Sequence, residues 1–280
     1  MNEPRTYRHS PIRLGLIILV FGVLSIGLLT TIGWTDYLIL IPSAGLFGII
    51  FLAILYSMTT KTTISDNEIS IQTILGTKSL TWGEINRVSG RGSAIKLHNF
   101  DGDMTVAPSQ QLPGYEEIVE WIGVKRPDLF NLQEYSEMTK DWINGILLPL
   151  FGLIVIGFGV FLMFQLNTTD SFFPVFIFFI IGIVILVTSF SAPQSLTIDG
   201  KSLLVKYLLN QKTLLAGEVQ SIELKHQSTR NGKVYFIMLN LIGKKSMRIS
   251  GLSPSLPIVY LTLKQWHKKN TPSGQTNQQN

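Results

Sequence analysis

The chain has 280 residues, of which 46% are hydrophobic and 15% are charged, and its formal net charge is +5. Soluble domains carry charge at about a quarter of their positions, so this composition excludes an average soluble protein. The absence of cysteine excludes a disulfide framework, a thiolate metal site and a cysteine nucleophile. The apolar excess is concentrated in four runs, and the remaining sequence is of ordinary soluble composition.

Residues 12–60 contain two long apolar runs that are separated by a short polar loop. Each run reaches the roughly 20 apolar residues that an α-helix needs to cross the hydrocarbon of a bilayer. We therefore predict a first transmembrane hairpin, preceded by a polar segment at residues 1–11. No small-residue cleavage pattern follows the first run, and Trp34 and Asp36 come next, so we interpret this helix as uncleaved.

A first soluble module is predicted at residues 61–131, followed by a linker at residues 132–141. Apolar residues alternate with polar ones, as in β-strands, and turns are expected at Gly76 and at Asp101-Gly102. A helix is expected to close the module. Its apolar face is predicted from Tyr115, Ile118, Val119 and Ile122.

The same order then recurs. A second hairpin is predicted at residues 142–190, a second module at residues 191–269 and a disordered polar tail at residues 270–280. The second module has turns at Asn210 and Asn231-Gly232 and a closing helix with Val259, Leu263 and Trp266 on one face.

The two halves match at a spacing of about 134 residues. At this spacing Lys78 falls on Lys212 and Glu84 falls on Glu218, which indicates a duplication. Because Glu84 and Glu218 recur, we assign them a structural role at a strand boundary rather than a chemical one.

The charges predict the orientation in the membrane. The short loops inside the hairpins carry Asp36 and Asp170 and neither Lys nor Arg. By the positive-inside rule, both modules and both termini face the cytoplasm of what we expect to be a multi-pass protein of a bacterial cytoplasmic membrane. The middle of each apolar run has no ionisable residue, which argues against a transporter or channel.

The predicted modules resemble the bacterial pleckstrin-homology (PH) domains found beside paired transmembrane helices. The resemblance is carried by the strand and turn at Ser65-Asp66-Asn67-Glu68-Ile69, by Leu80-Thr81-Trp82-Gly83-Glu84-Ile85, by Asp101-Gly102 and by the closing helix. The second module departs from the first in having Ala216 in place of Trp82. The resemblance implies an α+β membrane protein with four transmembrane helices in two hairpins, each hairpin followed by a PH-like β-roll with a C-terminal helix.

The second module is the cationic one. Residues 61–141 contain 8 Lys and Arg against 12 Asp and Glu, a net charge of −4, whereas residues 191–280 contain 12 against 3, a net charge of +9. A basic face tethered to a membrane would meet anionic lipid headgroups; a solvated surface without a particular partner is the alternative. The candidate lipid-binding residues are Lys225, Arg230, Lys233, Lys244, Lys245 and Arg248.

The sequence indicates no catalytic residues, metal ligands or cofactor site, because it assembles no nucleophile with a base and an orienting group. Nucleic-acid binding is disfavoured, since no aromatic platform accompanies the positive charge. We therefore expect a non-enzymatic protein whose modules bind anionic lipid, a partner protein or each other. The alternative is an accessory subunit of a transport or stress-response complex, for which the small residues Ala44 and Gly48 offer a helix-packing seam.

Overall fold

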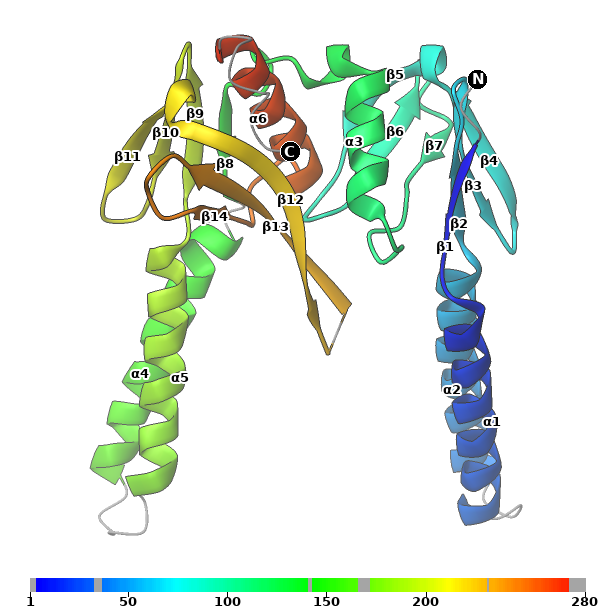
Figure 1. The fold of residues 1–280 in the computed structure, drawn as a ribbon. Helices are drawn as coiled ribbons and strands as arrows, with labels where there is room; N and C mark the ends of the chain where they lie inside the picture. Colours follow the sequence, from blue (N-terminus) through cyan, green and yellow to red (C-terminus); the bar gives the residue numbers. More distant parts are fainter. Residues whose placement is uncertain (1–3, 33–36, 141–142, 166–171, 231, 272–280) are drawn as a thin grey trace. The chain divides into compact units, whose positions relative to one another are not determined.

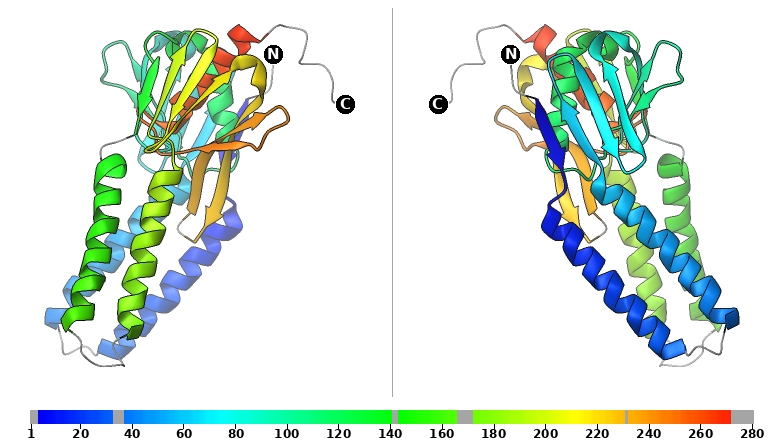
Figure 2. Two further views of the ribbon diagram at one scale, coloured as in Figure 1. Left: turned by 90° about the vertical axis from the view of Figure 1, so that its left-hand side faces the viewer. Right: turned by 90° about the vertical axis from the view of Figure 1, so that its right-hand side faces the viewer.

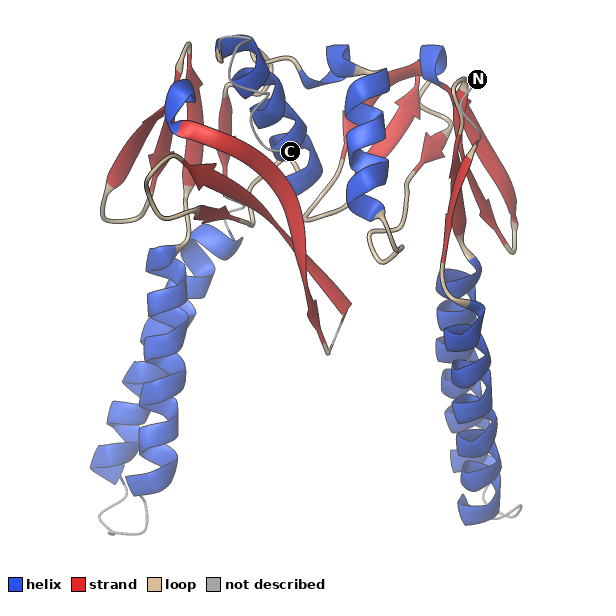
Figure 3. Ribbon diagram, in the orientation of Figure 1, coloured by secondary structure: helices blue, strands red, loops and turns tan. Residues whose placement is uncertain are grey.

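The structure is a computed structural model that describes residues 4–32, 37–140, 143–165, 172–230 and 232–271. The loop residues Asp36 and Asp170, Asn231 of the predicted hairpin turn and the tail beyond Thr271 lie outside the described residues. Across the described part, the chain is an α+β protein with several antiparallel sheets and six α-helices (Figures 1 and 3).

The chain divides into two compact units. Unit 1 comprises Met1–Val88 and Lys96–Trp121, and unit 2 comprises Ser89–Ile95 and Ile122–Asn280. Residues 89–95 and 122–131, which the sequence analysis assigns to the first module, thus cluster with unit 2.

Unit 1 contains a four-stranded and a three-stranded sheet. The four-stranded sheet is antiparallel, with the order β1-β2-β3-β4. The three-stranded sheet has the order β5-β6-β7, and helix α3 follows it in the chain. The elements are β1 (Arg5–Arg8), β2 (Lys61–Ile64), β3 (Glu68–Thr73), β4 (Gly76–Thr81), the 3-10 turn η1 (Trp82–Glu84), β5 (Ile85–Ser89), β6 (Lys96–Asn99), β7 (Thr105–Val106) and α3 (Tyr115–Lys125). The last residue of β5 and residues 122–125 of α3 cluster with unit 2.

A helix pair is inserted within the first sheet. Helices α1 (Pro11–Ile32) and α2 (Tyr37–Thr59) lie in sequence between β1 and β2. Arg8, the last residue of β1, pairs with Lys61, the first residue of β2, so both helices meet the sheet at one end. We call this the helix-facing end. Strand β1 was not predicted from the sequence, because its four residues lack apolar alternation and are mostly exposed.

Unit 2 repeats this arrangement. Its four-stranded sheet has the order β11-β10-β9-β8, and its three-stranded sheet has the order β12-β13-β14. Strand β8, within the predicted linker, precedes the helix pair, and Thr139 pairs with Ser195 across it. The elements are η2 (Pro127–Phe130), β8 (Glu137–Thr139), the π-helical turn η3 (Ile143–Leu147), α4 (Leu148–Gln165), α5 (Phe172–Ser191), β9 (Ser195–Asp199), β10 (Ser202–Lys206), β11 (Gln211–Leu215), η5 (Ala216–Glu218), β12 (Val219–Thr229), β13 (Gly232–Leu241), β14 (Met247–Ile249) and α6 (Leu256–Asn270).

The two units share strand registers at the predicted spacing. Ile71 pairs with Lys78 in unit 1, and Val205 pairs with Lys212 in unit 2. The two glutamates also form equivalent hydrogen bonds. Glu84 Oε2 accepts the backbone N–H of Thr81 at 2.9 Å, and Glu218 Oε2 accepts that of Leu215 at 3.0 Å. Each carboxylate caps a 3-10 turn, which confirms the structural role predicted for Glu84 and Glu218.

Unit 2 has Ala216 at the position equivalent to Trp82, and a tryptophan from its closing helix makes the corresponding hydrogen bond. In unit 1 the indole Nε1 of Trp82 donates to the carbonyl of Ser65 at 3.1 Å. In unit 2 the indole Nε1 of Trp266, from α6, donates to the carbonyl of Gly200 at 3.0 Å. Gly200 lies one residue beyond the position equivalent to Ser65. Each unit therefore ties the turn between two strands of its four-stranded sheet with one buried indole.

The closing helices bury the apolar faces that their sequences predict. Tyr115, Ile118, Val119 and Ile122 of α3 are buried, as are Val259, Leu263 and Trp266 of α6. The first two turns of α6 are buried on every side, beyond the single face predicted. The predicted turn at Asp101-Gly102 is confirmed, since Gly102 has φ = 76° and the Asn99 carbonyl accepts its N–H at 3.3 Å.

Two helical segments are long and apolar enough to cross a membrane, Ile41–Thr59 and Gly145–Phe164. Two further apolar helical segments, Leu14–Gly27 and Val175–Ser191, fall short of that length within the described residues. The structure therefore supports two spans by length and composition rather than the four that the sequence predicts.

Candidate functional site

The six candidate cations of unit 2 fall into separate groups along its three-stranded sheet. Arg230 and Lys233 lie at the closed end of the β12–β13 hairpin, where Ser228 pairs with Lys233. Lys244 and Lys245 lie in the exposed turn between β13 and β14, beyond the opposite end of β13. Because β13 has ten residues, about 30 Å of strand separates the groups. The six residues thus do not form a single patch.

The β12–β13 hairpin directs Arg230 and Lys233 toward the helices of unit 2. Lys206 of β10 pairs with Ser195, which follows α5, so β11 starts at the helix-facing end and runs away from it. Strand β12 then returns. In Figures 1 and 2 the closed end of this hairpin points to the side of unit 2 from which α4 and α5 extend. The β13–β14 turn lies away from that side, since Ile242 N–H donates to the Glu218 carbonyl at 2.9 Å.

Lys225 and Arg248 flank one aromatic side chain on the outer face of this sheet. Lys225 pairs across the strands with Phe236, and the Arg248 guanidinium carbon lies 4.0 Å from the centre of the Phe236 ring. Such a cation–π contact contributes about 0.5–1 kcal/mol at an exposed site. Lys225 also forms a 2.7 Å ion pair with Glu223, so part of its charge is already compensated.

Lys244 is engaged by an acidic residue of the structural repeat. Its Nζ lies 2.6 Å from Glu218 Oε1, while the second oxygen of Glu218 caps η5. The Lys244 hydrogen bond, followed by the backbone N–H of Leu215, holds the pKa of Glu218 below its ordinary value. Lys244 therefore serves the fold of unit 2 and is less suited to bind a lipid headgroup.

The Lys244–Glu218 pair gives a testable pH dependence. A folded-state pKa below the unfolded value means that Glu218 contributes stability above its unfolded pKa, and this is lost as the pH falls through the folded pKa. Lys244→Ala should raise the Glu218 pKa toward its ordinary value, as measured by NMR titration of the carboxyl carbon. Lys245→Ala is the matched control and should leave the pKa of Glu218 at its wild-type value. Equal titrations in wild type and Lys244→Ala would contradict the assignment.

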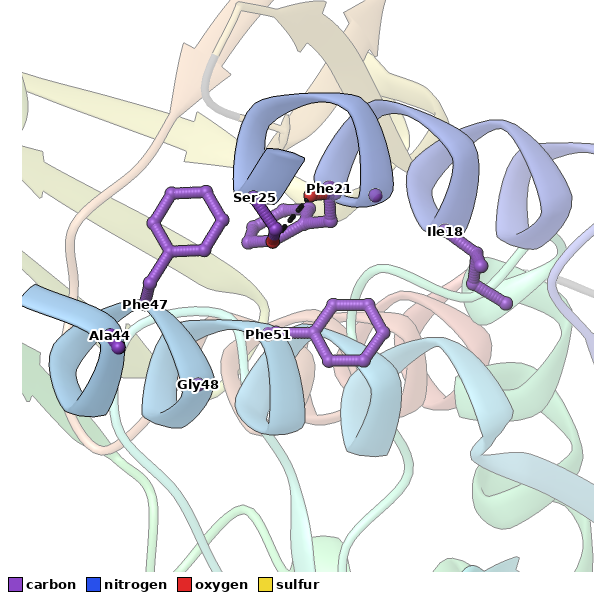
Figure 4. Close-up of a pocket in the computed structure, with 8 residues that line it drawn as sticks. Ile18, Phe21, Ser25, Ala44, Phe47, Gly48 and Phe51 are labelled. Carbon is purple, nitrogen blue, oxygen red and sulfur yellow. Dashed lines mark hydrogen bonds between the residues drawn. The ribbon is translucent and has the colours of Figure 1, made fainter. Parts of the chain in front are cut away.

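Helices α1 and α2 of unit 1 enclose an apolar groove of about 360 Å³. Figure 4 shows Phe21 and Ser25 of α1 with Phe47 and Phe51 of α2. The ring centre of Phe21 lies 5.0 Å from that of Phe47 and 5.2 Å from that of Phe51. Ser25 Oγ donates to the Phe21 carbonyl at 2.7 Å, so the groove presents little free polarity.

Comparison with known proteins gives no assignment. No family model matches the chain. No curated protein matches it at a significant level.

A helix-packing seam was expected at Ala44 and Gly48, whereas the structure shows close glycine contacts within the second helix pair, at Gly152 and Gly159. A Cβ added at Gly152 would lie 3.1 Å from Ile185 Cγ2, and one at Gly159 would lie 3.3 Å from Phe178 Cβ. At Gly48 no atom of the described residues lies within 4 Å of such a Cβ, apart from its chain neighbours and the nearby backbone of its own helix. Close approach of α4 and α5 therefore depends on glycine, whereas Gly48 lines the α1–α2 groove.

Within the described ranges no group of three or more His, Asp or Glu side chains gathers in an arrangement able to hold a metal ion. His98 instead shares a 3.0 Å hydrogen bond with Thr105 across β6 and β7. Two surface features of the described residues stand out, the exposed apolar helices and the cationic hairpin.

Proposed function

We propose that the chain is a non-enzymatic integral membrane protein with four membrane-crossing helices in two pairs. None of the Ile41–Thr59 segment and 11% of the Gly145–Phe164 segment is buried. The core helix of a soluble protein would be mostly buried, and an apolar surface of this length is unstable in water. Figure 2 shows that α1 lies beside α2 and that α5 lies beside α4. In this proposal α1 and α5 cross the membrane together with these partner helices. The positive-inside rule places both units in the cytoplasm.

We further propose that each unit is a PH-like module that binds or scaffolds at the membrane surface. A four-stranded sheet, a three-stranded sheet and a closing helix, in that order, occur in both units. Sheets followed by one closing helix are compatible with the β-roll and C-terminal helix that the resemblance to bacterial PH domains implies, and this supports the proposal. The helix pair is accommodated in the first turn of each module, between β1 and β2 or between β8 and β9.

The observation that carries the lipid-binding proposal is the direction of the β12–β13 hairpin. Its closed end points to the helix side of unit 2 (Figure 1), and it bears Arg230 and Lys233. Each cation that reaches an anionic leaflet contributes about 1 kcal/mol before screening. Anionic lipid headgroups on the cytoplasmic face are therefore the proposed ligand of this hairpin.

A single fluorescent label tests this proposal. The chain has no cysteine, so Ser228→Cys gives one attachment site beside Lys233 on the hairpin. In the full-length protein in nanodiscs, the label should leave water when anionic lipid replaces neutral lipid. Changing Arg230 and Lys233 together to Gln should lower the equilibrium constant for this contact with anionic lipid roughly 30-fold, because two cations contribute about 2 kcal/mol. The response should also fall with added salt.

The control exchanges Lys244 and Lys245 for Gln, which removes the same charge at the other end of β13. This variant should respond like the parent. An equal response of the parent in neutral and anionic nanodiscs would overturn lipid binding by the hairpin.

A second candidate, an accessory subunit of a larger membrane complex, is favoured by the α1–α2 groove. Its apolar lining of Phe21, Phe47 and Phe51 suits a helix of another membrane protein. Purification of the intact protein from native membranes separates the candidates, because recovery of one stoichiometric transporter subunit would favour this role. Recovery of the protein with lipid alone would oppose it.

A further inference from the structure

Two strand turns, one in each unit, expose pairs of large apolar residues at equivalent positions. Ile74 and Leu75 between β3 and β4 are 55% and 87% exposed, and Leu208 and Leu209 between β10 and β11 are 45% and 82% exposed. The pairs are 134 residues apart, which is the repeat spacing. Tight turns are ordinarily built from Gly, Asn, Asp and Ser, so leucine and isoleucine at both tips require an explanation outside the turn.

The turn in unit 1 is held in a defined conformation. Thr73 Oγ1 accepts the N–H of Leu75 at 3.2 Å, and it donates to the carbonyl of Gly76 at 3.2 Å. Gly76 has φ = 138°, which a residue with a side chain rarely adopts. In unit 2 the N–H of Tyr207 donates to the carbonyl of Asn210 at 2.7 Å. Both turns are therefore closed by hydrogen bonds and present their apolar pairs outward.

Strand register places both turns at the helix-facing ends of their sheets. Lys61, which follows α2, pairs with Gln72, two residues before Ile74. Ser195, which follows α5, pairs with Lys206, two residues before Leu208. In unit 1 a pocket of about 370 Å³ confirms the proximity, since Ile74 lines it together with Leu14 of α1 and Met58 of α2. Each apolar turn thus lies beside the point where a helix pair joins its sheet.

Cations lie directly behind the apolar tips. Lys78 pairs with Ile71 near the turn of unit 1, and Lys212 pairs with Val205 near the turn of unit 2. Two further lysines lie at the helix-facing ends of the sheets. Lys61 pairs with Gln72 in unit 1, and Lys206 pairs with Ser195 in unit 2. Apolar side chains in front of cations match the depth profile of a leaflet, where acyl chains lie beneath anionic headgroups.

We propose that Ile74-Leu75 and Leu208-Leu209 insert into the interfacial region of the bilayer that the helices cross. This inference rests on the proposed membrane-spanning function. Each unit would then be attached to the same leaflet at two points, its helix pair and its apolar turn. A lipid surface is favoured over a partner protein because both turns repeat the same position beside a helix pair, where lipid is the adjacent medium.

Spin labels on single cysteines in the full-length protein test the inference. Leu75→Cys and Leu209→Cys replace the two most exposed residues of the turns. Each labelled protein, reconstituted in liposomes with anionic and neutral lipid, is probed by EPR with oxygen, which partitions into lipid, and with a water-soluble nickel chelate. Both labels should be several-fold more accessible to oxygen relative to the chelate than a label at Ile242→Cys. Ile242 is also an exposed apolar turn residue, but its turn contacts Glu218 away from the helices.

A fourth label separates failure of this inference from failure of the proposed function. Leu153 is an exposed residue of α4, so a label at Leu153→Cys should be accessible to oxygen and not to the chelate. If Leu153 behaves in this way while the labels at residues 75 and 209 match the one at Ile242, the turns lie in water and only the inference is overturned. Chelate access at Leu153 would overturn the membrane-spanning function itself. Protection of both turns from both reagents would mean that a second copy covers them, and would also overturn insertion.

Discussion

Trp266→Ala is expected to destabilise unit 2 by about 3–5 kcal/mol, because it removes the largest fully buried side chain of the described residues. The indole also donates to the Gly200 carbonyl at 3.0 Å, which would be left without this donor. Hydrogen exchange of the full-length protein in nanodiscs measures the effect. Amides of β9 and β10 should exchange at least two orders of magnitude faster, since about 1.4 kcal/mol corresponds to a factor of ten.

Two further variants separate the contributions of packing and hydrogen bonding. Trp266→Phe retains most of the apolar volume and should cost less than the alanine variant, with about 1 kcal/mol or more arising from the lost hydrogen bond. Lys268→Ala, on the exposed side of α6, should leave exchange in β9 and β10 unchanged. If Trp266→Ala and Lys268→Ala exchange alike, the indole does not stabilise this sheet.

Gly182→Val should separate helices α4 and α5 and destabilise their pairing by about 1–3 kcal/mol. A Cβ at this position would lie 2.4 Å from Ile156 Cγ1 and 3.0 Å from the Gly152 carbonyl oxygen. The side chain of Ile156 can rotate, whereas the Gly152 carbonyl belongs to the backbone of α4, so the helices themselves have to move. The loss should appear as a lower midpoint for thermal unfolding of the detergent-solubilised protein.

Gly157→Val provides the matched control for this substitution. Gly157 lies on α4, and a Cβ added there meets no atom of the described residues within 4 Å, apart from its chain neighbours and the nearby backbone of its own helix. Both substitutions place the same β-branched residue in an apolar helix, so the helix propensity change is shared. The difference between the two variants then reports the α4–α5 contact alone. Equal melting of the two variants would show that the contact is not a source of stability.

The sequence predicted those parts of the fold that depend on local pattern. Strand alternation, the Asp101-Gly102 turn and the apolar faces of α3 and α6 each involve residues that are close in the chain, and the structure contains all of them. The recurrence of Glu84 at Glu218 was also sufficient to indicate a structural role at a strand boundary, and the structure shows that this role is to cap a 3-10 turn.

Strands β1 and β8 could not be predicted because their stability comes from distant partners. Each is four residues or fewer, and each pairs with a strand that lies beyond an entire helix pair. Short polar strands of this kind carry no periodic signal. The burial of α6 on every side was likewise hidden, since a sequence pattern reports one apolar face and not the number of surrounding elements.

The candidate site was predicted by residue type but not by arrangement. The count of cations correctly described unit 2 as basic, yet β13 separates Arg230 and Lys233 from Lys244 and Lys245. The distance between them depends on where the strand begins and ends. The apolar turns Ile74-Leu75 and Leu208-Leu209 were missed, although their recurrence at the repeat spacing was a signal that could have identified them.

The insertion of each helix pair between two neighbouring strands has a consequence for biogenesis. During synthesis β1 emerges first, and its partner β2 emerges only after α1 and α2 have been made. Under the proposed membrane-spanning function, sheet closure in unit 1 would wait until both helices have been integrated and the chain has returned, and the same delay would apply to β8 and β9. A polypeptide whose helices fail to integrate would keep open strand edges, which are sites of aggregation. Under that function, completion of either module would depend on the insertion of its own helix pair.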